Sequence, residues 1–232
     1  MALILSIETT TEVCSIAISK DGKSLFTEVD NEKNSHSQKL ISYIEAAFAK
    51  LKMSLSELDA VAVSHGPGSY TGLRIGMSVA KALCYALDKP LISVSTLHAL
   101  ANAGISQSAL AASDFFVIPM MDARRMEVFM CVVNQNMEEK LEVCSLVVEP
   151  DSFREWLSKP CYFVGNGVSK CLDLLNALEN ANVIDIPMSA EHLIPLAEKA
   201  FAVNDFVDIA YCEPFYLKEY IAGKPNVKGL RA

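Results

Sequence analysis

The segment that decides the fold is His65-Gly66-Pro67-Gly68-Ser69-Tyr70-Thr71-Gly72-Leu73-Arg74-Ile75-Gly76, between an apolar run at 60–64 and an almost uncharged run at 77–87. This pattern predicts a strand, a glycine-rich turn and a helix. Glycines in such a turn let the backbone approach a phosphate, and the start of the helix adds free N–H groups and a positive dipole end. The same glycines would also let two helices pack closely. Both interpretations remain open at this point.

The segments around this unit predict an order of three strands, a helix, a strand, a helix and a strand. The predicted strands cover 3–7, 13–18, 24–29, 60–64 and 91–94, with a tight hairpin at Asp21-Gly22. A capping-box pattern at 35–38 begins the first helix, and the second covers 72–87. This is the ribonuclease H-like arrangement, which sugar kinases, actin and Hsp70-type ATPases carry twice.

A second copy is visible in degenerate form after residue 103. Apolar runs at 115–122, 127–133 and 141–148 repeat the meander, and Asp122 with Glu127 echoes Glu8 with Glu12. A short helix at 153–158, a strand at 162–164 and helices near 168–178 and 190–203 follow. We therefore expect an α/β, duplicated ribonuclease H-like (actin-like ATPase, ASKHA) fold. Its lobes cover 1–103 and 104–232, with a small-residue boundary at 103–113 and a second lobe too short for a full copy.

Composition limits the function classes. The 232 residues are 51% hydrophobic, enough for two small lobes with a core, and no apolar run approaches the length of a membrane span. The N-terminus lacks the basic start of a signal peptide, so we expect a cytoplasmic protein. The net charge of −8 weighs against the chain holding RNA or DNA alone, because phosphate neutralisation needs a basic face.

The predicted second helix is unusually apolar. Only Arg74 and Lys81 are charged between 72 and 87, while Gly72, Gly76 and Ala80 form a small-residue stripe. Two faces of such a helix require burial. A subunit interface shared with the first helix is favoured over a helix buried under the second lobe, and without a partner it predicts a homodimer. The predicted interface consists of His36, Lys39, Leu40, Tyr43, Gly72, Arg74, Gly76, Val79, Ala80 and Leu83.

An ordered set of motifs resembles the TsaB family, also called YeaZ. The likeness covers nearly the whole chain, although Lys218 stands where an arginine is more usual. The matching segments are 4–10, 36–38, 65–76, 80–83, 94–101, 122–128, 164–167 and 213–217.

The resemblance implies a bacterial protein, often grouped with glycoprotease-like (M22-like) peptidases, that helps make N6-threonylcarbamoyladenosine beside the anticodon of tRNAs. In that family the catalyst is the paralogue TsaD, which transfers the threonylcarbamoyl group from threonylcarbamoyl-adenylate to the tRNA. TsaB is its partner and activator, and the ATPase TsaE docks on the pair. The TsaB–TsaD contact uses the two N-lobe helices of each chain. Contact with tRNA would then occur only through the complex.

The resemblance also allows a test for catalysis. The paralogue's metal is held by a His-x-x-x-His pair just after the fifth strand, and those positions fall here on Thr96 and Leu100, with His98 on neither. We therefore expect no metal site and no catalytic residue, and His98 to be a helix-start or core histidine. No G-x-S-x-G or H-E-x-x-H motif occurs, so a peptidase would depend on a spatial pairing such as His65 with Ser69.

The first turn keeps a nucleotide interpretation open. Actin-like ATPases place an acidic residue there for the metal–phosphate, and this chain has Glu8 followed by three threonines. No intrinsic cofactor is expected, and ATP or ADP with magnesium at a shared interface is favoured over a site in this chain alone. A stand-alone ATPase or kinase is the main alternative function. The candidate phosphate-binding residues are Glu8, Thr9, Thr10, Gly66, Gly68 and Ser69.

Overall fold

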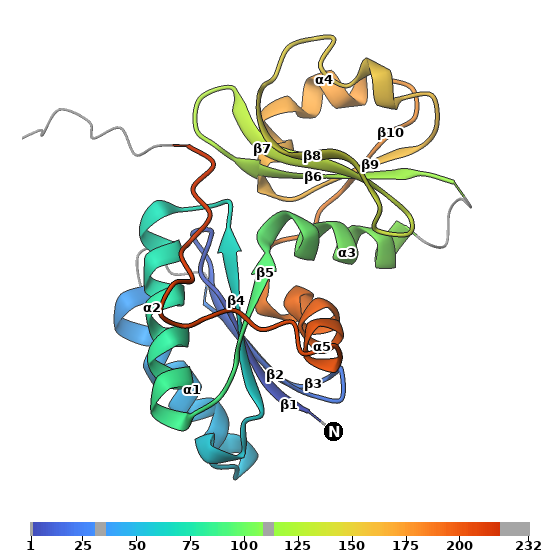
Figure 1. The fold of residues 1–232 in the computed structure, drawn as a ribbon. Coiled ribbons are helices and arrows are strands. Elements are labelled where there is room, and N and C mark those ends of the chain that lie inside the picture. Colours follow the sequence, from blue (N-terminus) through green and yellow to red (C-terminus); the bar gives the residue numbers. More distant parts are fainter. Residues whose placement is uncertain (1, 31–35, 109–113, 219–232) are drawn as a thin grey trace, which may run out of the picture.

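Two five-stranded sheets form the framework of the computed structural model, which describes residues 2–30, 36–108 and 114–218 (Figure 1). The first sheet has the order β3-β2-β1-β4-β5, with an antiparallel β1–β2–β3 meander and parallel β1, β4 and β5. Its strands are β1 (Leu3–Glu8), β2 (Cys14–Lys20), β3 (Lys23–Asp30), β4 (Ala60–Gly66) and β5 (Leu91–Ser95).

Local sequence explains these elements. Asp21 and Gly22 both have positive φ, of 51° and 71°, as a tight hairpin between right-twisted strands requires. Strand β1 is buried along its whole length because it is central in the sheet. On one face of the sheet lie α1 (His36–Leu51) and α2 (Tyr70–Leu87), which pack on Leu5 and Ile7. The capping-box residue Ser35 lies outside the described residues.

The second sheet repeats the first strand for strand. Its order is β10-β9-β6-β7-β8, so the expectation of a copy too short to be complete is wrong for the sheet. Only the helices of this copy are reduced, to η2 (Arg154–Trp156), η3 (Asn166–Cys171) and α4 (Leu172–Asn176). The strands are β6 (Phe116–Asp122), β7 (Glu127–Asn134), β8 (Glu139–Val147), β9 (Cys161–Val164) and β10 (Ala181–Ile184). The duplicated α/β fold is therefore confirmed.

Helix α3 (Thr96–Ser108) runs through the predicted boundary at 103. Its small residues let it pack closely on the second sheet: a Cβ added at Gly104 would stand 2.8 Å from Val117 Cγ1. Residues 103–108, which the sequence predicts as part of a boundary between lobes, therefore form a helix that packs on the second sheet. Residues 109–113 lie outside the described residues.

After β10 the chain returns to the first sheet. The segment contains η4 (Ala190–Leu193) and α5 (Ile194–Ala202), which lie beside the face of the first sheet opposite α1 and α2 (Figure 1). The Ala190 N–H donates to Ser15 Oγ at 2.9 Å, and the Val207 N–H donates to the Leu91 carbonyl at 3.0 Å. The predicted second lobe, 104–232, therefore includes a segment that covers the first lobe. In the described part of the chain, no helix is long and apolar enough to span a membrane.

Candidate functional site

The glycine-rich turn joins β4 to α2, and Ser69 is the N-cap of that helix. The Gly72 N–H donates to Ser69 Oγ at 3.3 Å, so the helix begins at Tyr70, two residues before the predicted start. The turn therefore has the strand–turn–helix geometry that the sequence predicts.

The glycines of the turn are occupied by the chain's own β1–β2 turn. A Cβ at Gly68 would stand 2.6 Å from Thr10 Cβ, and Cβ atoms at Gly72 and Gly76 would overlap the Thr9 carbonyl oxygen and Thr9 Oγ1. Two hydrogen bonds fix this approach: the Ser69 N–H donates to the Thr10 carbonyl at 2.7 Å, and Thr9 Oγ1 donates to the Gly72 carbonyl at 2.8 Å. These glycines therefore allow close packing, as one of the two interpretations predicts. The segment that packs against them is the β1–β2 turn and not a second helix.

Glu8 is fully buried at the end of β1, and its carboxyl group is already satisfied. Oε1 accepts hydrogen bonds from the Thr10 N–H and Oγ1, both at 2.5 Å, and Oε2 accepts one from Ser64 Oγ. Burial raises the pKa of Glu8, while the hydrogen bonds from Ser64 and Thr10 oppose that rise. A carboxyl group closed in this way does not fit a magnesium–nucleotide in this chain alone.

The C-terminal segment passes over the other end of the turn. The Phe215 N–H donates to the His65 carbonyl at 2.7 Å, and a Cβ at Gly66 would stand 2.5 Å from the Phe215 carbonyl oxygen. Further along, Lys218 pairs with Glu127 at the start of β7, so the segment connects the two lobes (Figure 1). The candidate phosphate residues at both ends of the turn therefore contact the protein's own backbone.

His65 and Ser69 each have other contacts and do not form the catalytic pair that a peptidase would need. The His65 ring packs edge-on against Phe215, at 6.2 Å between centroids, and burial lowers the pKa of His65, while Ser69 Oγ caps α2. His98 lies in the first turn of α3, and its Nε2 is 2.8 Å from Glu139 Oε1 on β8.

The two positions that correspond to the paralogue's metal ligands, Thr96 and Leu100, are buried. The described ranges contain no group of three His, Cys, Asp or Glu side chains placed to hold a metal ion.

The predicted interface divides into an inward and an outward part. Gly72, Gly76 and Ala80 are buried and face the β1–β2 turn and the sheet, so they cannot contact a partner. Leu40 is also buried in the core. The reason is the position of α2, whose small-residue stripe lets it cross close to Thr9.

The other predicted interface residues are accessible to different degrees. Arg74 is exposed, and Lys39, Tyr43, Val79 and Leu83 are half-buried. Tyr43 Oη donates to Asp30 Oδ2 at 2.6 Å, and Lys39 pairs with the same oxygen at 3.4 Å. The side chain of His36 lies outside the described residues.

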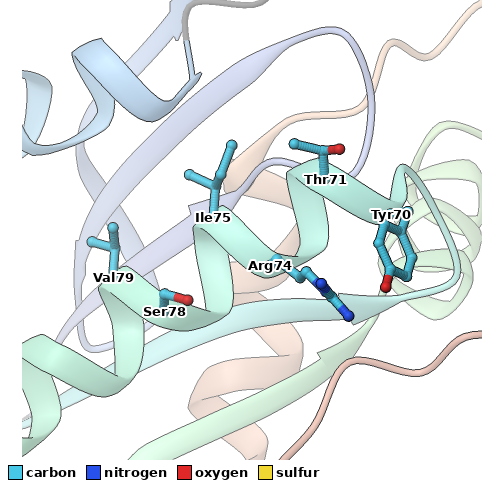
Figure 2. A pocket seen from close by; sticks show the side chains of 6 residues that line it. All are labelled: Tyr70, Thr71, Arg74, Ile75, Ser78 and Val79. Atoms are coloured by element: carbon cyan, nitrogen blue, oxygen red, sulfur yellow. The ribbon is translucent and has the colours of Figure 1, made fainter. Parts of the chain in front are cut away.

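The outer side of α2 carries an open hollow of about 450 Å³. Figure 2 shows its side chains projecting from the helix, with Thr71, Ile75 and Val79 along one edge and Arg74 beside Tyr70. Of the lining residues, Tyr70, Thr71, Ile75 and Ser78 are absent from the predicted interface. The four-residue spacing of 71, 75 and 79 is the signal that could have identified this face.

Comparisons with known proteins agree on the family. A family model described as TsaD, tRNA N6-adenosine threonylcarbamoyltransferase, matches residues 30–211. The tRNA threonylcarbamoyladenosine biosynthesis protein TsaB of Escherichia coli K12 is 30% identical, over 95% of this chain and 96% of its own. A threonylcarbamoyltransferase of Syntrophomonas wolfei is 34% identical, over only 42% of this chain and 33% of its own.

Solved structures agree with that result. YeaZ from Pseudomonas aeruginosa has a TM-score of 0.75 at 26% identity, covering 94% of this chain and all of that one. A polyphosphate/ATP-glucomannokinase from Arthrobacter, with a TM-score of 0.51 and 13% identity, covers 88% of this chain and all of its own and shares the fold alone. The chain therefore belongs to the TsaB family of tRNA threonylcarbamoyladenosine biosynthesis proteins.

Proposed function

We propose that this chain is the non-catalytic partner subunit in the formation of N6-threonylcarbamoyladenosine in tRNA, and that it binds and activates a TsaD-type transferase. The names of the full-length relatives support the pathway. The lengths support the assignment to a non-catalytic subunit, since the chain matches the TsaB proteins of Escherichia coli and Haemophilus influenzae over almost their whole length but a transferase over about a third of its length.

One observation carries the proposal: the chain fills its own candidate ligand site and leaves the outer side of α2 uncovered. Thr9 and Thr10 occupy the space beside Gly68, Gly72 and Gly76. The open hollow lies on the opposite side of the same helix (Figure 2). A surface of this kind, with Ile75 and Val79 beside polar groups, suits a protein partner better than a small molecule, which needs an enclosed pocket.

The remaining parts of the complex are proposed from the family resemblance. We propose that the partner covers α1 and α2, that a TsaE-type ATPase docks on the pair, and that tRNA is held only through the complex, in keeping with the net charge of −8. Without the partner, the outer face of α2 would form a homodimer. ATP or ADP with magnesium would bind at the shared interface and not at Glu8.

Reconstitution tests the proposal. The chain, its TsaD-type subunit from the same organism, threonylcarbamoyl-adenylate and tRNA are combined, and modified tRNA is quantified. We expect no modified tRNA with this chain alone. The transferase together with this chain should form much more modified tRNA than the transferase alone. ATP hydrolysis, phosphoryl transfer or peptide cleavage by the chain alone would contradict the proposal and favour the ATPase or peptidase alternative.

A matched pair of variants locates the surface. Ser78→Arg places a bulky charge at an exposed position of the hollow, whereas Ala202→Arg places the same charge at an exposed position on α5, on the other side of the first sheet. Ser78→Arg should prevent co-elution with the transferase in size-exclusion chromatography, and Ala202→Arg should not. Equal co-elution of both variants would show that the outer face of α2 is not the interface.

A further inference from the structure

Arg74 is held in place by two tyrosines, Tyr70 one turn earlier on α2 and Tyr216 in the C-terminal segment. Its guanidinium carbon lies 4.2 Å from the centre of the Tyr70 ring, and Nε donates to Tyr216 Oη at 3.0 Å. The two tyrosine rings are themselves 4.9 Å apart. Tyr216 belongs to the C-terminal segment. The preceding residue, Phe215, is hydrogen-bonded through its N–H to the His65 carbonyl in β4. The orientation of Arg74 therefore depends on the tertiary fold.

This arrangement leaves most of the guanidinium available. Among the described residues, Nε is the guanidinium nitrogen that has a hydrogen-bond partner, and the N–H groups on the two terminal nitrogens can match a carboxylate in bidentate geometry. In the described parts of the chain, no carboxylate forms an ion pair with Arg74. An arginine that is already ordered loses less side-chain entropy when it binds a ligand than a mobile one does.

The surroundings indicate what the free side of Arg74 would meet. Arg74 lines the hollow on the outer side of α2, and no other charged side chain of the described residues lines it. The other lining residues include Ile75 and Val79, which favour a protein surface as the cover. A partner that covers this hollow would remove Arg74 from water, and an uncompensated buried charge is strongly unfavourable. A negative group at this point of the partner would compensate that charge.

We infer that Arg74 is the binding site for an Asp or Glu side chain of the partner subunit, and that Tyr216 is the positioning residue that orients the guanidinium toward it. The inference rests on the proposed function, since it names the contact through which the TsaD-type subunit would bind. It also gives the C-terminal segment a role, because its Tyr216 couples the conformation of residues 213–218 to the docking surface.

Isothermal titration calorimetry with the TsaD-type subunit tests this site. Arg74→Ala should weaken binding about thirtyfold or more, and Arg74→Lys, which keeps the charge but not the planar fork, about tenfold. The matched control is Lys199→Ala, which removes a positive charge from an exposed position of α5, on the other side of the first sheet; it should change the affinity less than about threefold. Because these positions are not in the core, the melting temperatures of all three variants should stay near that of the parent chain.

The positioning role of Tyr216 is tested by the affinity of a Tyr216→Phe variant for the partner subunit. Tyr216→Phe keeps the ring and removes the hydroxyl that holds Nε, so it should weaken binding several-fold in the parent chain. In the Arg74→Ala background the same substitution should have no effect on affinity, because there is no guanidinium left to orient. Equal effects of Tyr216→Phe in both backgrounds would assign Tyr216 a role independent of Arg74 and overturn that part of the inference.

The outcomes separate the two levels of the proposal. A parent chain that does not bind the transferase refutes the proposed function and the inference with it. A parent chain that binds, with Arg74→Ala and Arg74→Lys binding equally well, refutes only the carboxylate site. Rescue of Arg74→Glu by one Asp→Arg or Glu→Arg variant of the partner would confirm the site and identify the acidic residue.

Discussion

Gly76→Ala is expected to destabilise this chain, although the same change would stabilise an isolated helix. Replacing a helical glycine by alanine contributes about 0.5–1 kcal/mol of stability. Here, however, the added Cβ would overlap Thr9 Oγ1, in a place held by the hydrogen bond from Thr9 to Gly72. Overpacking of this kind costs about 1–3 kcal/mol. The net expectation is a loss of about 1–2 kcal/mol in the free energy of unfolding.

In a chain that also carries Thr9→Ala, Gly76→Ala should be stabilising and not destabilising. Without Oγ1, the nearest atoms to the new Cβ are Thr9 Cβ and Val63 Cγ2, both at an ordinary 3.5 Å. Thr9→Ala by itself loses one hydrogen bond, worth about 1 kcal/mol. In that background, Gly76→Ala should stabilise the chain by about 0.5–1 kcal/mol, so the coupling between the two sites is about 2 kcal/mol.

Urea unfolding followed by circular dichroism measures these differences as shifts of the transition midpoint. Ser78→Ala, at an exposed position of the same helix, is the control and should not destabilise. The reasoning is refuted if Gly76→Ala is as stable as the parent chain, or if its effect is the same with and without Thr9→Ala. Gly76→Ala should also still bind the partner while folded, because Gly76 does not reach the surface.

Three further changes test other parts of the structure. Burial raises the pKa of Glu8 above 4.5, so the parent chain should lose stability as pH rises from about 4.5 toward the folded pKa; Glu8→Gln should remove this decline, measured by urea midpoints across pH. Ser69→Ala removes the α2 cap and should lower the unfolding free energy by about 1 kcal/mol in the same assay. Lys218→Met removes the main cause of the lowered pKa of Glu127, so an NMR titration should show that pKa rising toward its ordinary value; no change would contradict the placement of the C-terminal segment.

Much of the fold could be predicted from local sequence. The strands of both meanders are apolar runs bounded by turn residues, and their order limits the topology to a repeated ribonuclease H-like sheet. The omitted strand β10 is short, lies at the edge of its sheet and leaves Asn182 and Val183 exposed, so it has no apolar pattern to detect. The predicted break is wrong for 103–108, which belong to α3, because small residues mark close packing as well as loops.

The sequence by itself determined that α2 would be apolar and would follow a glycine-rich turn, and it predicted a face of this helix for a partner. It could not determine which face. Residues 71, 75 and 79 and residues 72, 76 and 80 are adjacent stripes with the same spacing, and either could have pointed outward. The tertiary structure decided between them, because a glycine permits close approach without specifying what approaches. Here Thr9 and Thr10, brought in by β1, occupy the space beside the glycines, so the outward side of α2 presents Ile75, Val79 and an arginine held by a tyrosine of the C-terminal segment.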